Sequence, residues 1–217
     1  MVETMDLAGL RAEYGRAGLD EGDLTPEPVE LFERWLGDAL DAGLHDPNAM
    51  VVATADEQGA PSARLVLLKE LRTEGGEAGF VFFTNTGSRK GRELAANPRC
   101  ALLFPWHALE RQVRVDGVAA PLPAEDVAAY FATRPRGSKL GAWASRQSRV
   151  TTRAALAAAY EDAERRYPGE VPVPEEWGGY VVRAQEVEFW QGRPGRMHDR
   201  LRYVRADGGW RTERLAP

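Results

Sequence analysis

The residues with the clearest chemical potential lie near the C-terminus, in the segment Arg196-Met-His-Asp-Arg200. Arg196, His198 and Arg200 alternate along the chain, so an extended backbone would place all three basic groups on one face. Two guanidiniums beside an imidazole repel one another unless an anionic or electron-rich group lies between them. Because the chain has only three histidines and a net charge of −5, this local gathering of basic groups predicts a ligand site.

A second candidate site lies where a strand predicted at residues 79–84 ends and a helix predicted at residues 88–96 begins. Ser88 is the expected N-cap of that helix, and Arg89 and Lys90 follow in its first turn. Positive charge in the first turn opposes the helix dipole, whereas the free N–H groups there bind phosphate readily. An anion site and an ordinary cap with solvated basic side chains explain this pattern equally well.

Tyr130, Arg134 and Ser138 form a weaker pattern with steps of four residues. Pro135 disfavours helix at the residue before it, so the second step is predicted to be a turn. A guanidinium between two hydroxyl groups could hold a phosphate.

Arg64 and Lys69 flank an apolar run, five positions apart, and would lie on opposite faces of an ideal strand. They could contact two different anions, although a buried strand whose charged ends reach water is the better explanation. Gln112 and the pair Gln147-Ser148 are weak candidates for polar contacts to a ring. Trp190 is the best tryptophan for a ligand wall, because it lies six residues before Arg196.

Composition excludes several classes of function. Hydrophobic residues make up 43% and charged residues 28% of 217 residues, as in ordinary globular proteins. We expect no nucleic-acid partner, because the net charge is −5 and no basic stripe is evident. A single cysteine, Cys100, fits a reducing cytoplasm, and its run indicates a buried strand. No apolar stretch approaches the roughly 20 residues of a membrane span. We expect no metal site, because the sequence shows no group of residues with the spacing of metal ligands.

The elements that must position these groups are mainly strands. Residues 1–27 are predicted to form a polar N-terminal arm, and residues 28–217 a single domain. Strands are predicted at residues 49–55, 64–68, 79–84, 99–104, 111–118, 180–190, 201–205 and 210–215, and helices at 28–44, 88–96, 123–133 and 153–167. This order favours a mainly β fold, an antiparallel barrel with added helices.

Several segments together carry a resemblance to a known family. They are Arg64-Leu-Val-Leu-Leu-Lys69, Phe83-Thr-Asn-Thr-Gly-Ser-Arg-Lys90, Leu103-Phe-Pro-Trp-His-Ala-Leu-Glu-Arg-Gln-Val113, Arg134-Pro-Arg-Gly-Ser138, Gly141-Ala-Trp143, Arg146-Gln-Ser148, Glu188-Phe-Trp-Gln-Gly192, Arg196-Met-His-Asp-Arg200 and Arg214-Leu-Ala-Pro217. In this order they resemble the pyridoxamine 5′-phosphate oxidase family, from about Arg11 to the last residue. The resemblance implies an FMN-binding antiparallel split β-barrel that works as a homodimer, with FMN at the subunit interface.

The resemblance also implies the roles of individual residues. The FMN site would comprise Arg64, Leu65, Val66, Leu67, Leu68, Lys69, Phe83, Thr84, Arg89, Lys90, Gln112, Gln147, Ser148, Trp190 and Arg200. The substrate phosphate would meet Lys69, Tyr130, Arg134 and Ser138. Arg196 and His198 would be the catalytic residues that hold the substrate ring against the flavin, and Arg11 to Tyr14 would close over it as a lid. One departure is Phe83, which stands where tyrosine is usual in the family.

The implied reaction is the oxidation of pyridoxamine or pyridoxine 5′-phosphate to pyridoxal 5′-phosphate. O2 would accept the electrons and give H2O2, and the amine substrate would also release NH3. Two alternatives remain: a flavin oxidase of the phenazine pathway, and a carrier that binds flavin or pyridoxal phosphate without turnover. Tyr130, Arg134, Ser138, Arg196 and His198 favour the vitamin B6 substrate over the phenazine one. A non-catalytic carrier would need only the anion sites, so it would give no reason for the alternation of Arg196, His198 and Arg200.

Overall fold

The computed structural model describes residues 13–15, 18–74 and 77–217. Contacts within the chain define two compact units. Unit 1 comprises the described residues within 1–47, 104–114 and 186–217, and unit 2 those within 48–103 and 115–185. Three strands, β5 (Arg99–Trp106), β6 (Arg111–Pro121) and β7 (Trp177–Gln191), therefore contribute residues to both units.

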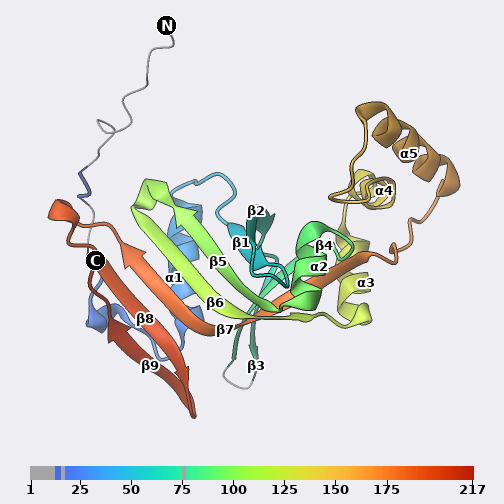
Figure 1. Cartoon of the computed structure of the whole chain (residues 1–217). Helices are drawn as coiled ribbons and strands as arrows, with labels where there is room; N and C mark the ends of the chain where they lie inside the picture. Colours follow the sequence, from blue (N-terminus) through green and yellow to red (C-terminus); the bar gives the residue numbers. More distant parts are fainter. Residues whose placement is uncertain (1–12, 16–17, 75–76) are drawn as a thin grey trace, which may run out of the picture. The chain divides into compact units, whose positions relative to one another are not determined.

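Unit 2 is built on a sheet with the strand order β2-β1-β5-β6-β7-β4-β3. Its other strands are β1 (Ala49–Ala55), β2 (Pro61–Leu67), β3 (Glu70–Glu74) and β4 (Glu77–Asn85). β1 runs antiparallel to β2 and β5, and β4 runs antiparallel to β3 and β7. Its helices are α2 (Arg89–Ala96), α3 (Ala124–Thr133), α4 (Arg136–Ala144) and α5 (Arg153–Arg166), of which α4 and α5 pack together (Figure 1).

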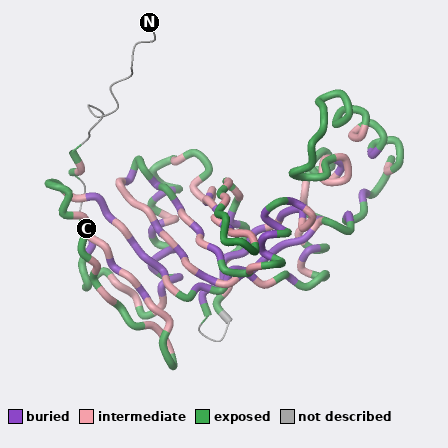
Figure 2. Tube along the Cα trace, viewed as in Figure 1, coloured by how far each residue is buried: buried purple, intermediate pink, exposed green. Residues whose placement is uncertain are grey.

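Burial in unit 2 follows from the strand period. In β1 the buried residues Met50, Val52 and Thr54 alternate with half-buried ones, because successive side chains of a strand point to opposite faces. β4 is buried at nearly every position, as expected for a strand covered on both faces. Figure 2 shows buried residues concentrated in the strands, whereas α5 is mostly exposed.

Helix α2 begins where the sequence predicts it. Ser88 is the N-cap, and its hydroxyl accepts a hydrogen bond from the N–H of Gly91 at 3.3 Å. Gly91 is required here because a Cβ would lie 2.1 Å from the carbonyl oxygen of Thr86. The close approach of the β4–α2 turn to the first turn of the helix fixes the backbone that carries Lys90.

Unit 1 contains α1 (Pro28–Asp41), β8 (Asp199–Ala206), β9 (Gly209–Arg214) and the short 3₁₀ turns η1 (Glu21–Asp23), η2 (His107–Leu109) and η3 (Pro194–Arg196). β7, β8 and β9 pair antiparallel in that order. Pro28 starts α1, and its apolar stripe packs on the strands: the Phe32 and Phe104 ring centroids are 4.7 Å apart, and those of Trp35 and Phe189 are 5.2 Å apart. These aromatic side chains form the core of the unit.

The mainly β, antiparallel fold class predicted from the sequence is confirmed, and each predicted strand and helix exists with small shifts of its ends. Among the strands and α-helices of the described residues, β3 and α4 escaped prediction. The prediction that Arg64 and Lys69 share one strand is wrong, because β2 ends at Leu67. Among the described residues, no helix is long and apolar enough to span a membrane. The single domain over residues 28–217 stays a prediction.

Candidate active site

A cavity of about 440 Å³ lies in unit 2. It is lined by the end of β2, the end of β4, the first turn of α2, the α3–α4 junction and the segment after α4. The lining residues are Leu65, Val66, Leu67, Lys69, Phe83, Thr84, Asn85, Lys90, Tyr130, Arg134, Pro135, Ser138, Gln147 and Trp177. Most of them are residues that the sequence predicted for the FMN or the substrate phosphate. The lining holds three cations and no carboxylate, so its chemistry suits an anion.

Lys90 is the most deeply buried of these cations, with 6% of its surface exposed. Its Nζ donates to the Thr84 hydroxyl at 3.0 Å and to Gln147 Oε1 at 2.8 Å. Burial is the main cause that lowers the pKa of Lys90 to about 8, and the positive charge of Arg64 lowers it further. The negative charge of Glu93 acts in the opposite direction. Both hydrogen-bond acceptors are neutral, so an anion in the cavity would stabilise the ammonium further.

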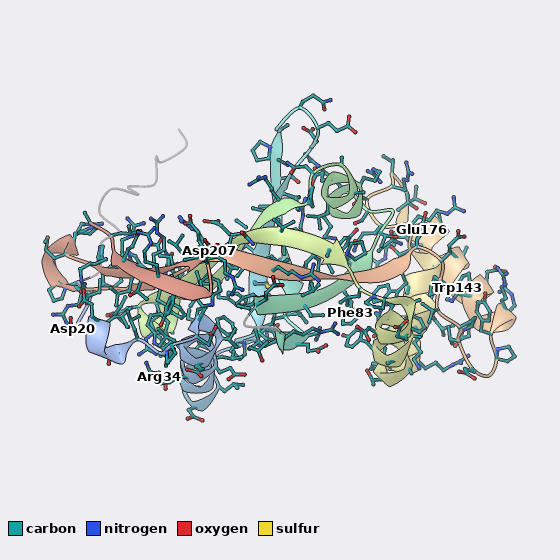
Figure 3. The ribbon with its side chains drawn as sticks, turned by 90° about the horizontal axis from the view of Figure 1, so that it is seen from below. Asp20, Arg34, Phe83, Trp143, Glu176 and Asp207 are labelled. Atoms are coloured by element: carbon teal, nitrogen blue, oxygen red, sulfur yellow. The ribbon has the colours of Figure 1, made fainter. Side chains whose placement is uncertain are left out.

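Arg134 is held by aromatic rings at the α3–α4 junction. Its guanidinium carbon lies 3.9 Å from the Trp177 ring centroid, and its Nη2 donates to the carbonyl of Ser138 at 3.1 Å. Burial lowers the pKa of the guanidinium. Tyr130 of α3 stacks on Phe83 with centroids 3.8 Å apart, and Figure 3 shows Phe83 beside that helix. The predicted break in the helix at Arg134 is confirmed, since the residue has extended φ/ψ. The prediction that the step to Ser138 is a turn is wrong, because α4 begins at Arg136 and includes Ser138.

Three buried polar atoms at this cavity have no hydrogen-bond partner among the described residues: Arg134 Nη1, Trp177 Nε1 and Asn85 Oδ1. Buried polar groups are normally paired, and an unpaired one is costly. Two of the three are donors, one of them cationic. The cavity therefore fits a phosphate or another polar anion.

Other predicted FMN residues of unit 2 lie next to the cavity without lining it. Leu68 is buried, with 5% exposed. Arg64 lies close enough for its charge to act on Lys90, and its guanidinium binds Thr54, Ser62 and Glu93. Ser148 accepts a hydrogen bond from the Arg89 N–H at 3.0 Å, which places its hydroxyl at the N-terminus of α2.

Unit 1 holds a cluster of three rings formed by Tyr14, Trp190 and His198. The centroid distances are 5.7 Å for Tyr14 and Trp190, 5.4 Å for Tyr14 and His198, and 4.7 Å for Trp190 and His198. His198 Nδ1 accepts a hydrogen bond from the Arg193 N–H at 3.1 Å. The neutral imidazole therefore carries its proton on Nε2 and presents that nitrogen as a donor.

The prediction that Arg196, His198 and Arg200 share a face of one extended segment is wrong at Arg196. This residue ends turn η3 with φ +61° after Gly195 with φ +62°, and the extended strand begins only at Asp199. A left-handed conformation costs a non-glycine residue about 1–2 kcal/mol, so the local fold imposes it. The Arg196 side chain is exposed.

Arg200 is fixed on β8 by the buried Glu188. Its Nε donates to Glu188 Oε1 at 2.7 Å and its Nη1 to the carbonyl of Ala216 at 2.9 Å. Hydrogen bonding to Glu188 raises the pKa of Arg200. Gln112 is half-buried on β6. Arg11 lies outside the described residues, so its predicted place in a lid stays a prediction.

Trp177, Asn85, Glu188 and Glu93 are site neighbours that sequence reasoning did not single out. Glu93 had a local signal, because it lies four residues after Arg89 on the same helix and pairs with it. Trp177 and Asn85 are register partners on β7 and β4, 92 positions apart in the chain, and no local pattern links them.

An antiparallel β fold with a cationic cavity and a cluster of rings defines a protein equipped for anionic, ring-bearing ligands. Residues 36–167 match the family model described as pyridoxamine 5′-phosphate oxidase, and residues 177–217 match the pyridoxine 5′-phosphate oxidase C-terminal dimerisation region. The chain belongs to the pyridoxamine 5′-phosphate oxidase family.

Relatives support this membership over the whole chain. The pyridoxine/pyridoxamine 5′-phosphate oxidase of a Nocardioides species is 68% identical over 98% of this chain and 99% of its own length. That of Citrobacter koseri is 51% identical over 99% and 98%. The crystal structure of PhzG from Burkholderia lata 383 with tetrahydrophenazine-1-carboxylic acid is 30% identical, has a TM-score of 0.87, and covers 95% of this chain and 100% of its own. An FMN-binding protein from Nostoc punctiforme, 17% identical with a TM-score of 0.68 over 89% of this chain and 99% of its own, shares the fold.

Proposed function

We propose that this protein oxidises pyridoxamine 5′-phosphate and pyridoxine 5′-phosphate to pyridoxal 5′-phosphate with FMN as cofactor. O2 is the electron acceptor and gives H2O2; the amine substrate also takes up water and releases NH3. One observation carries this proposal from the structure: the cationic cavity of unit 2, in which Arg134 Nη1 is buried without a partner among the described residues. The family membership supports the same reaction.

The donor set of unit 2 fits the phosphate of FMN. Lys90 and Gln147 line the cavity, and the Ser148 hydroxyl lies at the N-terminus of α2. We assign the FMN phosphate to Arg64, Arg89, Lys90 and Ser148, because cations and a helix N-terminus stabilise a phosphate together. FMN supplies the hydride acceptor and the route for electrons to O2. The residues around FMN bind the cofactor and orient it.

A second anion of the reaction is the substrate phosphate. We assign it to Lys69, Tyr130, Arg134 and Ser138, which line the same cavity. Trp177 supports the Arg134 guanidinium from one side, and the free Nη1 is available to a phosphate oxygen. A bidentate guanidinium contact would fix the direction of the substrate as well as its position.

Arg196 and His198 are proposed to hold the substrate ring. His198 presents Nε2–H as a donor, because its Nδ1 is occupied by the Arg193 N–H. The exposed Arg196 would supply positive charge and a flat surface for stacking. Tyr14 packs edge-on against His198 and limits the movement of its ring.

The C-terminal match to a dimerisation region supports a homodimer. FMN at its subunit interface is part of the proposal. A cytoplasmic location is also proposed, since Cys100 is the single cysteine and is free, as is usual in a reducing compartment.

The rival with structural support is a flavin oxidase acting on a reduced phenazine, because PhzG shares the fold at 30% identity. The FMN-loaded protein is incubated in air with pyridoxamine 5′-phosphate, pyridoxine 5′-phosphate or a reduced phenazine carboxylic acid. We expect one H2O2 per pyridoxal 5′-phosphate formed, and NH3 from the amine alone. Turnover of the phenazine without the other two substrates would establish the rival, and bound FMN with no turnover would indicate a carrier.

A further inference from the structure

Glu93 of α2 is a buried carboxylate to which the proposed mechanism gives no role. Its side chain is 5% exposed, and it lies between Arg64 and Arg89, two of the cations assigned to the FMN phosphate. A buried charge is costly unless it is paired and hydrogen-bonded. The buried Glu93 carboxylate must therefore be stabilised by the groups around it.

Four donors converge on this carboxylate. Oε2 accepts from the Thr54 hydroxyl at 2.5 Å, from the Ser62 hydroxyl at 2.6 Å and from Arg64 Nη2 at 3.3 Å, whereas Oε1 accepts from Arg89 Nε at 2.7 Å. Burial acts to raise the pKa of Glu93, but the hydrogen bonds from Ser62, Thr54, Arg89 and Arg64 lower it to about 2. The carboxylate is thus ionised throughout the physiological range.

Both guanidiniums are oriented by this arrangement. Arg64 also donates through Nη1 to Thr54 Oγ1 at 2.5 Å and through Nη2 to Ser62 Oγ at 2.5 Å. These bonds fix the guanidinium through its terminal nitrogens, and its Nε lies outside them. Arg89 uses Nε for its ion pair, which leaves its terminal nitrogens outside that contact. Since Arg89 is 55% exposed, the bond to Glu93 restricts an otherwise mobile side chain.

We propose that Glu93 is a positioning residue for the phosphate of FMN: it holds Arg64 and Arg89 in place for the phosphate without contacting the cofactor. The inference rests on the proposed FMN site. Two effects of Glu93 oppose each other, because its charge repels a phosphate while its hydrogen bonds preorganise the cations and offset their mutual repulsion. Preorganisation of the cations is the larger of these two effects.

The test compares FMN with riboflavin, which has the same ring system and no phosphate. Apo-protein is titrated with each ligand, and the dissociation constant is measured from flavin fluorescence. In Glu93→Gln, which keeps the side-chain volume, we expect the dissociation constant for FMN to rise about 10- to 100-fold, as for the loss of two preorganised contacts. The value for riboflavin should change less than about 2-fold, because Glu93 acts only through the phosphate cations.

Glu77→Gln is the matched control, since Glu77 forms an exposed ion pair with Arg183 in the same unit. It should leave both constants unchanged. Glu93→Asp keeps the charge on a shorter side chain and should give an intermediate loss of FMN affinity; it is also the test if Glu93→Gln fails to fold. Unchanged or tighter FMN binding in the folded variant, or equal losses for both ligands, would overturn the positioning role. A wild-type protein that binds no FMN would instead contradict the proposed function itself.

Discussion

At the scale of single residues, the cavity of unit 2 keeps cations in surroundings that disfavour their charge. Lys90 has only neutral acceptors, Thr84 and Gln147, within hydrogen-bonding distance among the described residues. Arg134 is half-buried against Trp177, and burial lowers its pKa. Such groups bind an anion more strongly than solvated ones, because the ligand charge replaces missing solvation.

The lowered pKa of Lys90 predicts that FMN binding depends on pH. In the free protein its pKa is lowered from 10.5 to about 8, and a phosphate would raise it again. FMN affinity should therefore fall as the pH rises through 8, with proton uptake on binding near that pH. Calorimetric titrations in two buffers of different ionisation enthalpy measure both quantities. Lys90→Met should bind FMN more weakly and without this step; a wild type with flat affinity across pH 8, or the same step in the variant, would contradict the assignment.

The lowered pKa of Lys90 also makes the free energy of unfolding of the apo-protein depend on pH. Between pH 8 and 10.5 the unfolded chain binds more protons at this position than the folded one. The contribution of Lys90 to the free energy of unfolding therefore rises with pH across that window. Below pH 8 both states are protonated, and the folded state keeps the cost of a buried charge.

At the scale of elements, the N-terminal arm is joined to the C-terminal strands by Arg214. Its guanidinium pairs with Glu21 at 2.7 Å, with Asp199 at 2.8 Å and with Asp20 at 3.2 Å. The N–H of Leu19 donates to the same Asp199 at 3.0 Å. The anchored residues follow Tyr14, which contacts the His198 ring, in the chain. The arm is therefore predicted to contribute to substrate binding.

Arg214→Gln should loosen the arm and raise the KM for pyridoxamine 5′-phosphate about 5-fold, which corresponds to about 1 kcal/mol for a partly exposed ion-pair network. FMN content should stay unchanged, because the proposed FMN residues remain. Limited proteolysis with mass spectrometry should show faster cleavage before Glu21. Arg211→Gln is the control, since it removes the ion pair of the exposed Arg211 with the half-buried Glu213. Equal kinetics in both variants would exclude a role for the arm.

Elements with strong local signals were predictable from the sequence, and elements that depend on distant contacts were not. Ser88 identified the start of α2, and the β-rich composition of residues 49–55 identified β1. Helix α4 was missed because Pro135 indicates a turn and the nine residues after it include Gly137 and Gly141. Its buried residue, Leu140, packs with Ala163 of α5, a contact that the local sequence does not contain.

The same limit applies to the site. Lys69, Tyr130, Arg134 and Ser138 were predicted as a phosphate site, and the structure brings them to one cavity. The alternation of Arg196, His198 and Arg200 was misleading, because Gly195 and Arg196 leave the extended conformation. No pattern in the sequence singled out Trp177, which lines the cavity and lies against the Arg134 guanidinium.

At the scale of the whole molecule, the two units carry different kinds of proposed site residue. Unit 2 supplies the cations and hydroxyl groups for phosphates, and unit 1 supplies the ring cluster with Arg196 and Arg200. Relatives match the chain over nearly its full length, so both units belong to the family architecture. The proposed reaction requires that FMN bound to this protein take two electrons from pyridoxamine 5′-phosphate.

The most direct test is an anaerobic single turnover. The FMN-loaded protein is mixed with pyridoxamine 5′-phosphate without O2, and the visible flavin absorption and the aldehyde product are followed together. We predict loss of the flavin band with one pyridoxal 5′-phosphate formed per FMN, and about 100-fold slower loss in Arg196→Ala at unchanged FMN content, as for removal of one group that stabilises a transition state. A flavin band that persists in the wild-type protein at saturating substrate would contradict the account.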